Sequence, residues 1–388
     1  MHEDVDKYRV YELEEYIRTG EPQKEERSRA WSTAIGLQQV DQLNTSKYLR
    51  DTALRHIEGE ISISEAKDLI NAYYQTEAGR SEDDKGHTEE ADKVSARIME
   101  LLADRSFSMS SAQYISIHRH LFTGIYSHAG MIRDYNITKK EWVLRGETVF
   151  YSSFDTISAN LAFDIQQEKD FDYKGMNIYA VIRHLAKFCS NLWQTHAFGE
   201  GNTRTTAVFM IKYLHTLGLN VNNDVFASHS WYFRNALVRA NYNNLAEGVT
   251  ETTVFLERFF RYMILGDKVE LRNREMHLDW GKVKDLYKTE REPEENHDAQ
   301  SATDTVQSAT DTAQSAISLP PKCKNCTLDQ IAVMRVIQAN PRVTQRQIAK
   351  EIGLSERTVK TITIVLSALG IIRRYNGKRN GYWKIIYK

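Results

Sequence analysis

The sequence predicts a mainly α-helical protein with few strands. Apolar residues recur at a helical spacing through most of the chain, and only five prolines interrupt its 388 residues. One segment differs from the rest. Residues 289–324 are small, polar or charged, including a near-repeat of Gln-Ser-Ala-Thr-Asp-Thr, and they bury too little apolar surface to form a core. We therefore expect helical units on both sides of a flexible linker.

The overall composition limits the classes of function. A hydrophobic content of 41% with 27% charged residues is typical of a soluble protein. The net charge of -1 argues against a chain that coats nucleic acid along its whole length. Residues 327–388 are basic, however: they hold 12 Lys+Arg and 3 Asp+Glu, a net charge of 12 - 3 = +9. The first residues lack a basic and apolar leader, and no run approaches the roughly 18 apolar residues of a membrane span. We expect a cytoplasmic protein without membrane contact.

The predicted helices follow from apolar spacing, from polar caps and from glycine or proline at their ends. In the first hundred residues they cover 8–17, 25–43, 46–57, 64–74 and 88–102. Ala78 to Gly86 is polar and contains glycine, which predicts a solvated loop. Further helices are predicted over 110–124, 155–167, 177–195, 205–217, 231–242, 252–265 and 280–287.

A short β-hairpin is the one predicted exception to this helical pattern. Trp142-Val-Leu and Thr148-Val-Phe-Tyr flank the turn residues Arg145-Gly-Glu. An isolated hairpin is marginal in water, so it must pack on the helices or pair with an extended segment of a partner. The residues expected on the pairing strand are Thr148, Val149, Phe150 and Tyr151.

The loop from His196 to Arg204 carries the chemistry of the chain. It places a histidine, the carboxylate of Glu200, a Gly-Asn pair and an arginine directly before an apolar helix. The free amides of a helix start suit phosphate oxygens, and a carboxylate beside them can hold Mg²⁺. With an ordinary pKa of about 6.5, the histidine can accept a proton from a hydroxyl. The loop predicts nucleotide chemistry; the simpler alternative is a polar loop that only caps the helix.

The C-terminal end predicts a winged helix-turn-helix. Helices are predicted over 328–338, 344–352 and 355–369, and residues 371–375 and 381–387 alternate like a two-stranded wing. The start of the third helix offers Arg357 and Lys360 to base edges, and the wing offers basic residues to phosphates. The wing residues are Arg373, Arg374, Lys378 and Arg379. This module predicts DNA binding, with protein docking as the alternative.

The cysteines predict no metal site. Cys323 and Cys326 form a single CxxC without a second pair, so we expect two exposed thiols in the linker rather than a zinc site. Cys189 lies inside a helical pattern and is expected to be a small buried apolar residue.

The loop resembles the signature of the Fic family, His-Pro-Phe-x-(Asp/Glu)-Gly-Asn-x-Arg-x-x-Arg. Here it stands as His196-Ala-Phe-Gly-Glu-Gly-Asn-Thr-Arg-Thr-Thr-Ala207, and the resemblance extends over about residues 110–265. It implies a helical Fic fold in which the hairpin is similar to the family's target-docking flap. It also implies an enzyme that transfers AMP from ATP, its substrate, to a hydroxyl of a protein target, with Mg²⁺ as the cofactor.

The same resemblance implies a role for each matching residue. His196 is implied to be the general base and Glu200 the Mg²⁺ ligand. Phe198 is implied to anchor the loop in the core, Gly201 and Asn202 to form the anion hole, and Arg204 to hold the terminal phosphates. The implied nucleotide-binding set is Phe198, Gly199, Gly201, Asn202, Thr203 and Arg204.

The sequence departs from the family pattern in two places. Ala197 replaces the proline, and Ala207 replaces the last arginine, which the family uses to grip the γ-phosphate and to pair with an inhibitory glutamate. The inhibitory pattern (Ser/Thr)-x-x-x-Glu-(Gly/Asn) is matched only in part. The stretch from Ser32 has the hydroxyl without the glutamate, and Glu58-Gly59 has the glutamate without the hydroxyl. Glu58 is the candidate inhibitory residue, and autoinhibition stays open.

These observations divide the chain into four parts. Residues 1–109 form a helical region with a candidate regulatory helix, 110–288 the Fic domain, 289–326 the linker and 327–388 the winged helix. The first hypothesis is an AMP transferase joined to a DNA-binding module. The second is a transcription regulator that senses a nucleotide, and the third is a Fic enzyme that moves another group, such as UMP or phosphocholine. The oligomeric state stays open.

Overall fold

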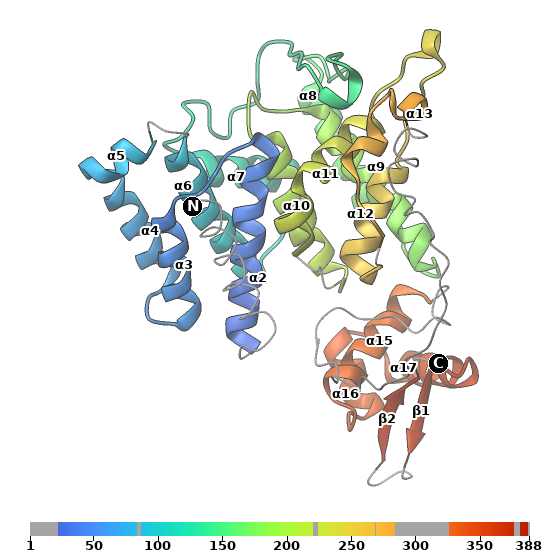
Figure 1. Ribbon diagram of the computed structural model, residues 1–388. Helices are drawn as coiled ribbons and strands as arrows, with labels where there is room; N and C mark the ends of the chain where they lie inside the picture. Colours follow the sequence, from blue (N-terminus) through green and yellow to red (C-terminus); the bar gives the residue numbers. More distant parts are fainter. Residues whose placement is uncertain are drawn as a thin grey trace, which may run out of the picture.

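A computed structural model of the chain describes residues 22–83, 87–219, 224–267, 269–283, 326–375 and 381–386. These residues are mainly helical, and the strands among them form one two-stranded sheet near the C-terminus (Figure 1). The mainly α fold class is therefore confirmed. The predicted helix over 8–17 and the predicted linker over 289–324 lie outside the described residues.

The N-terminal part is a series of helices with serine caps. Ser46 caps α3, and Ser62 forms a capping box with Glu65 at the start of α4. The predicted solvated loop after α4 is wrong over its described part, which forms α5, because the Thr76 hydroxyl accepts a hydrogen bond from the Gly79 amide (3.1 Å) in the first turn. The elements are α2 (Pro22–Gly36), η1 (Leu37–Asp41), α3 (Lys47–Glu58), α4 (Ile63–Tyr73), α5 (Glu77–Asp83) and α6 (Thr88–Ala103).

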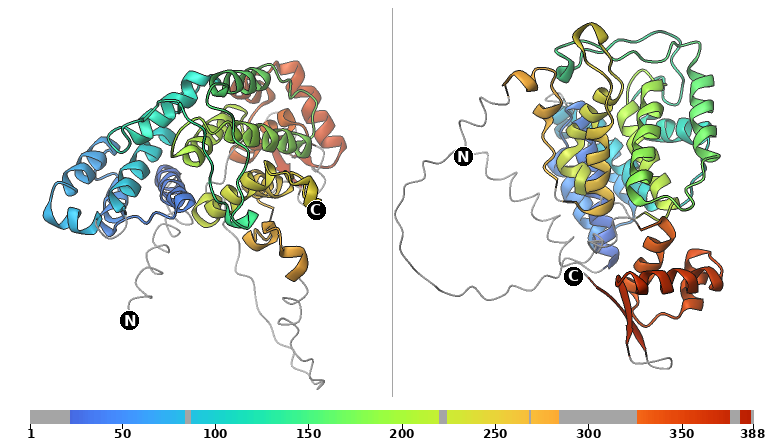
Figure 2. Two further views of the ribbon diagram at one scale, coloured as in Figure 1. Left: turned by 90° about the horizontal axis from the view of Figure 1, so that it is seen from above. Right: turned by 90° about the vertical axis from the view of Figure 1, so that its right-hand side faces the viewer.

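The middle of the chain packs around α10, which spans Asn202–Thr216. Every residue from Asn202 to Leu214 is buried. Helices α6, α7 and α9 contact α10, with α3 to α5 on one side of the molecule and α12 on the other (Figures 1 and 2). The elements are α7 (Ser111–Phe122), η2 (Trp142–Leu144), α8 (Ile157–Lys169), α9 (Ile178–Thr195), α11 (Asp224–Ala240), η3 (Leu245–Glu247), α12 (Val254–Leu265), η4 (Asn273–Met276) and α13 (Trp280–Val283).

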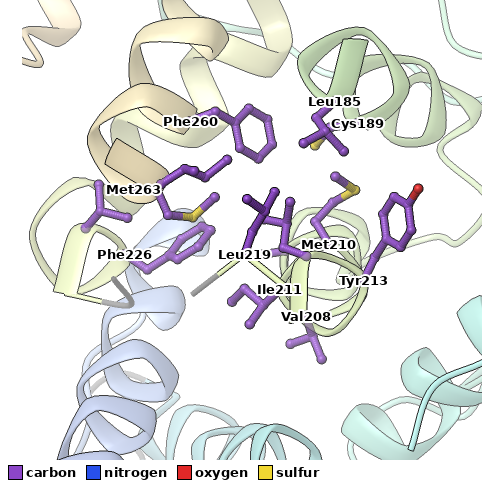
Figure 3. Packing of buried hydrophobic residues seen from close by; sticks show 14 of the residues in the cluster. Leu185, Cys189, Val208, Met210, Ile211, Tyr213, Leu219, Phe226, Phe260 and Met263 are labelled. Atoms are coloured by element: carbon purple, nitrogen blue, oxygen red, sulfur yellow. The ribbon is translucent and has the colours of Figure 1, made fainter. Parts of the chain in front are cut away.

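The apolar side of α10 is fixed by neighbouring helices. Val208, Met210 and Ile211 of α10 are buried together with Leu185 of α9 and Phe260 of α12 (Figure 3). Interiors of this kind are close-packed, so the helix has little freedom to shift. The first turn of α10 is therefore held in a fixed place.

The predicted hairpin over residues 142–151 does not form. Trp142–Leu144 is the 3₁₀ turn η2, and Thr148 to Tyr151 form no strand. The reason is a tight loop closed by Glu141, whose amide donates to the Glu147 carbonyl (2.9 Å) and whose carbonyl accepts from the Leu144 and Gly146 amides. These bonds use backbone groups that a two-stranded ladder would need. We call residues 138–152 the flap.

The C-terminal part is a three-helix unit with a wing, as predicted. It consists of α15 (Leu328–Ala339), α16 (Gln345–Ile352), α17 (Glu356–Ala368), β1 (Ile372–Tyr375) and β2 (Tyr382–Ile385). The strands are antiparallel, with Ile372 opposite Ile385. Thr327 and Thr344 form capping boxes at the first two helices.

No helix in the described part of the chain is long and apolar enough to cross a membrane.

The cysteines follow the predictions in part. Cys189 is buried as predicted. The prediction of two exposed linker thiols is wrong for Cys326, which is buried and takes part in a disulfide bond.

Candidate functional site

The loop between α9 and α10 turns sharply at both ends. His196 follows the last residue of α9 in the left-handed region at φ 45°, and its amide donates to the Trp193 carbonyl (3.0 Å). Gly201 precedes α10 at φ 74°. The helix thus begins at Asn202, three residues earlier than predicted. Arg204 therefore lies in the first helical turn.

Asn202 and Phe198 give the loop its shape. The Asn202 side-chain oxygen accepts from the Phe198 amide (3.0 Å), and its nitrogen donates to the Phe198 carbonyl (2.7 Å). The Phe198 ring is fully buried and stacks on His118 with 3.7 Å between ring centroids. Phe198, placed by the resemblance in the nucleotide-binding set, thus lies in the core beneath the loop.

His118 holds the loop from the α7 side. Its Nδ1 accepts from the Gly130 amide (2.8 Å), so its Nε2 carries the proton and donates to the Glu200 carbonyl (3.0 Å). Burial lowers the pKa of His118 to about 4, which keeps the ring neutral. No local sequence pattern distinguishes His118 from an ordinary core histidine.

The start of α10 presents free amide donors. Among the residues that the structure describes, the first-turn amides of Asn202, Thr203 and Arg204 donate to no acceptor. The helix dipole adds partial positive charge at this end. Thr203 points its hydroxyl into the protein, where it accepts from Trp193 Nε1 (3.0 Å). The backbone of this turn, rather than the Thr203 side chain, can therefore bind an anion.

His196 is buried under the flap. It is 3% exposed, and within the described structure neither ring nitrogen has a hydrogen-bond partner. Tyr151 of the flap covers it, with 4.1 Å between ring centroids. Burial lowers the pKa of His196 well below its usual value, and the charges of Lys139, Arg133 and Arg234 add to this. The ring is neutral at pH 7 and can accept a proton.

Arg133 ties the loop between α9 and α10 to the flap. Its Nε donates to the His196 carbonyl (2.8 Å), its other guanidinium nitrogens donate to the Ser152 and Tyr135 carbonyls, and its amide donates to the Ala197 carbonyl (2.9 Å). The side chain is buried. This arginine was missed because nothing local in the sequence distinguishes a buried arginine from an exposed one.

Glu200 is the accessible carboxylate of the loop. Its side chain is 55% exposed, and its Oε2 lies 3.0 Å from the Lys139 ammonium. The described residues contain no group of three metal-binding side chains. A single carboxylate nevertheless suits Mg²⁺ that arrives with nucleotide phosphates, because Mg²⁺ keeps phosphate and water ligands. Glu200 is the residue that could hold the metal.

Arg204 is enclosed in the protein. Its guanidinium forms an ion pair with Asp41 (Nε to Oδ2, 2.8 Å), donates to Glu90 (2.7 Å) and to Gln38 (3.0 Å), and lies 4.8 Å from the centre of the Phe122 ring. Burial alone would lower the pKa of Arg204, but the nearby Asp41 and Glu90 raise it. A role in holding phosphates would require Arg204 to leave these partners.

The candidate inhibitory residue Glu58 is not among the partners of Arg204. Glu58 ends α3, where it pairs with Lys24 (2.7 Å). The carboxylates at Arg204 come instead from η1 and α6, far away in the sequence. The signature position Ala207 is fully buried in α10.

The flap is fastened at Glu141. This buried carboxylate accepts two bonds from Arg234 of α11 (2.6 and 3.2 Å) and one from the Tyr151 hydroxyl (3.4 Å). The Gln194 amide group donates to the Phe150 carbonyl (3.1 Å). Of the predicted docking residues, Val149 is buried, Thr148 accepts from the Lys139 amide, and Phe150 is 78% exposed.

The sequence profile of the Fic/DOC family matches residues 108–214, which include α7, the flap, α9 and the loop. The chain carries a Fic/DOC domain. A second profile, winged helix-turn-helix DNA-binding, matches residues 330–373. No curated protein matches the chain. The Fic domain as matched ends within α10, so the profile covers every residue of the signature.

The winged helix-turn-helix domain presents an exposed basic surface. Arg357 and Lys360 of α17 are exposed, as are Arg373 and Arg374 of β1. The Arg374 guanidinium lies 4.9 Å from the centre of the Trp383 ring, which orients it. Lys378 and Arg379 lie outside the described residues. The winged helix supports DNA binding, as the Fic domain supports a Fic-family function.

Proposed function

We propose that the Fic domain transfers AMP from ATP to a hydroxyl group of a target protein. One observation carries the proposal: a neutral histidine and the free amides of a helix start stand at the two ends of one loop that the core holds in shape. The histidine supplies a proton acceptor, and the amides supply anion binding. This pairing suits transfer of a phosphorus-centred group, in which positioning and charge neutralisation dominate.

In the proposed reaction the target hydroxyl oxygen attacks the α-phosphorus of ATP. The bond from that phosphorus to the oxygen bridging the β-phosphate breaks, and pyrophosphate leaves. The hydroxyl proton passes to a ring nitrogen of His196, and the amides of Asn202 and Thr203 bind α-phosphate oxygens. Mg²⁺ bound at Glu200 would supply positive charge to the phosphates.

The flap controls access of the target to His196 in this proposal. Because Tyr151 covers the imidazole, an acceptor side chain reaches His196 only when Tyr151 moves aside. The exposed Phe150 ring next to it is an apolar anchor that a target segment can bind. We propose that target docking on the flap uncovers the base.

The test is transfer of label to protein. Full-length chain with Mg²⁺, a lysate and ATP labelled at the α-phosphate should label a band, whereas ATP labelled at the γ-phosphate should not. His196→Ala should reduce labelling about 10²- to 10⁴-fold, the usual contribution of a general base. His215→Ala at the opposite end of α10 is the matched control. Label from the γ-phosphate, or equal labelling by the His196 variant, would contradict AMP transfer.

A second candidate is a DNA-binding regulator in which the Fic domain senses a nucleotide. Ala207 favours it, because nucleotide binding can survive the loss of a phosphate-gripping arginine when transfer does not. In this case ATP should bind without labelling any protein and should change DNA affinity. A salt-dependent gel shift with and without ATP separates the two candidates. Competition by UTP or CTP would reveal another transferred nucleotide.

A further inference from the structure

The Fic domain lacks an evident cation for the outer phosphates of ATP. Ala207 stands at the position of the signature's last arginine and is buried. Arg204, the remaining signature arginine, is enclosed by Asp41, Glu90 and Gln38. A triphosphate that binds here carries several negative charges, so the position of the nearest available cation decides how the outer phosphates are held.

Three cations lie close enough to His196 to lower its pKa: Lys139, Arg133 and Arg234. Arg133 uses its guanidinium on the carbonyls of His196, Tyr135 and Ser152. Arg234 binds both oxygens of the buried Glu141. Moving either arginine would leave buried acceptors unpaired, which costs more than the hydrogen bond itself contributes. Both arginines therefore stabilise the flap and are not available to bind phosphates.

Lys139 is different because, in the part of the chain that the structure describes, its ammonium has a single partner. It binds Glu200 Oε2 at 3.0 Å, and its side chain is 25% exposed. It also lines a groove of about 740 Å³ between the flap and the loop after α11. A lysine ammonium on its flexible four-carbon stem can change partner without disturbing the backbone.

We propose that Lys139 contacts the β- and γ-phosphates of ATP in place of the missing arginine. This inference rests on the proposed function. Mg²⁺ held by Glu200 would bring positive charge to the phosphates, and the Lys139 ammonium, 3.0 Å from that carboxylate, lies within reach of phosphates bound beside it. With ATP bound, Lys139 would donate its hydrogen bond to a phosphate oxygen instead of to the Glu200 carboxylate. During transfer it neutralises charge on the leaving pyrophosphate.

Lys139 could instead keep Mg²⁺ away from Glu200, and this blocking role predicts the opposite change in ATP affinity when the lysine is removed. If the ammonium only blocks Glu200 against Mg²⁺, its removal frees the carboxylate and tightens binding of Mg²⁺-nucleotides. If it contacts the outer phosphates, its removal weakens ATP binding and leaves AMP binding nearly unchanged, since AMP lacks those phosphates. Comparing ATP with AMP therefore separates the two roles.

The experiment is calorimetric titration of ATP and of AMP, with Mg²⁺, into full-length chain carrying His196→Ala to prevent turnover. Lys139→Ala should weaken ATP binding about 10-fold or more, the usual effect of losing a hydrogen bond between charged groups, and AMP binding less than about twofold. Lys140→Ala is the matched control, because the neighbouring lysine lines the same groove without contacting Glu200. Lys139→Arg should retain most of the ATP affinity.

Each outcome has a distinct meaning. Equal ATP affinity in the Lys139→Ala and Lys140→Ala variants would overturn the role of Lys139 while leaving AMP transfer in place. Tighter ATP binding by Lys139→Ala would overturn it in favour of the blocking role. If the chain binds neither nucleotide, both the proposed function and this inference fail. Thermal melting of all variants checks that the differences in binding do not come from misfolding.

Discussion

The nine-residue loop of the Fic domain contains two kinds of residue that behave in opposite ways. Phe198, Asn202 and Arg204 find their partners inside the protein, by stacking, by loop closure and by buried ion pairs. Within the described residues, by contrast, the His196 ring nitrogens have no hydrogen-bond partner, and the Glu200 carboxylate binds a single lysine from the flap. Much of the signature therefore specifies the shape of the loop, and only a small part of it is left to contact the substrate of the proposed reaction.

This division has a physical cause. Binding an anion with backbone amides requires those amides to be fixed before the ligand arrives, because reorganisation at the moment of reaction would offset the gain. The enclosed residues provide that fixation at the first turn of α10. In the proposed reaction His196 and Glu200 must instead keep their polar atoms free to exchange a proton or a metal ion. Substitutions should therefore separate into those that lower stability and those that lower activity.

The largest expected loss of stability comes from Arg204→Ala. The substitution removes a fully buried guanidinium from two partly exposed carboxylates, Asp41 and Glu90, and breaking such an ion pair should cost about 3 kcal/mol. Urea unfolding should show a clearly lower midpoint. The matched control is Glu200→Ala, which removes an exposed side chain of the same loop and should change stability by less than about 0.5 kcal/mol. Equal losses would contradict the division.

The next largest expected loss of stability comes from alanine substitution at one of the two loop glycines, Gly201, compared with the other, Gly199. Gly201 has φ 74°, and a Cβ there would lie 2.4 Å from the Phe122 ring, so Gly201→Ala should cost about 2–3 kcal/mol. At Gly199 the nearest atom to a Cβ is the Tyr135 hydroxyl at 2.8 Å, the far end of a side chain that can move. Gly199→Ala should cost less than about 1 kcal/mol. Thermal melting checks both, and a larger loss at Gly199 would contradict the proposed loop geometry.

Local signals explain what the sequence could predict. The winged helix has local signals for its helices: capping boxes at Thr327 and Thr344, and the apolar spacing of α17. Each signal involves only neighbouring residues, and these helices formed as predicted. The loop after α9 could be predicted for the same reason, because its signals also lie in neighbouring residues. A glycine before an apolar helix and a histidine beside a carboxylate can be recognised without knowing the fold.

Distant contacts explain what the sequence could not predict. Arg204 pairs with Glu90 across 114 positions, and Arg234 pairs with Glu141 across 93. Neither pairing has a local signal. The flap was predicted as a hairpin because its apolar residues flank a glycine, yet the backbone bonds of Glu141 close it as a compact loop. Local turn hydrogen bonds overrode strand propensity there.

The smallest expected effect on stability tests the electrostatics of His196. Its pKa in the folded protein is depressed below about 6.5, its value in the unfolded chain, so between these two values the unfolded chain binds the proton and the folded chain does not. Stability therefore falls as pH drops below about 6.5, by up to about 1.4 kcal/mol per pH unit. Above that pH the contribution is constant.

The measurement is urea unfolding of wild type and of His196→Gln between pH 7.5 and 5. The difference between the two proteins isolates His196, because the other buried histidines titrate in both and cancel. Wild type should lose stability relative to the variant as the pH falls. A relative gain would mean that the folded protein holds the imidazole in its charged form, and His196 could then not accept the hydroxyl proton at neutral pH. The pH dependence of this stability difference thus tests two things: the depressed pKa of His196 in the folded chain, and the neutral imidazole that the proposed AMP transfer requires.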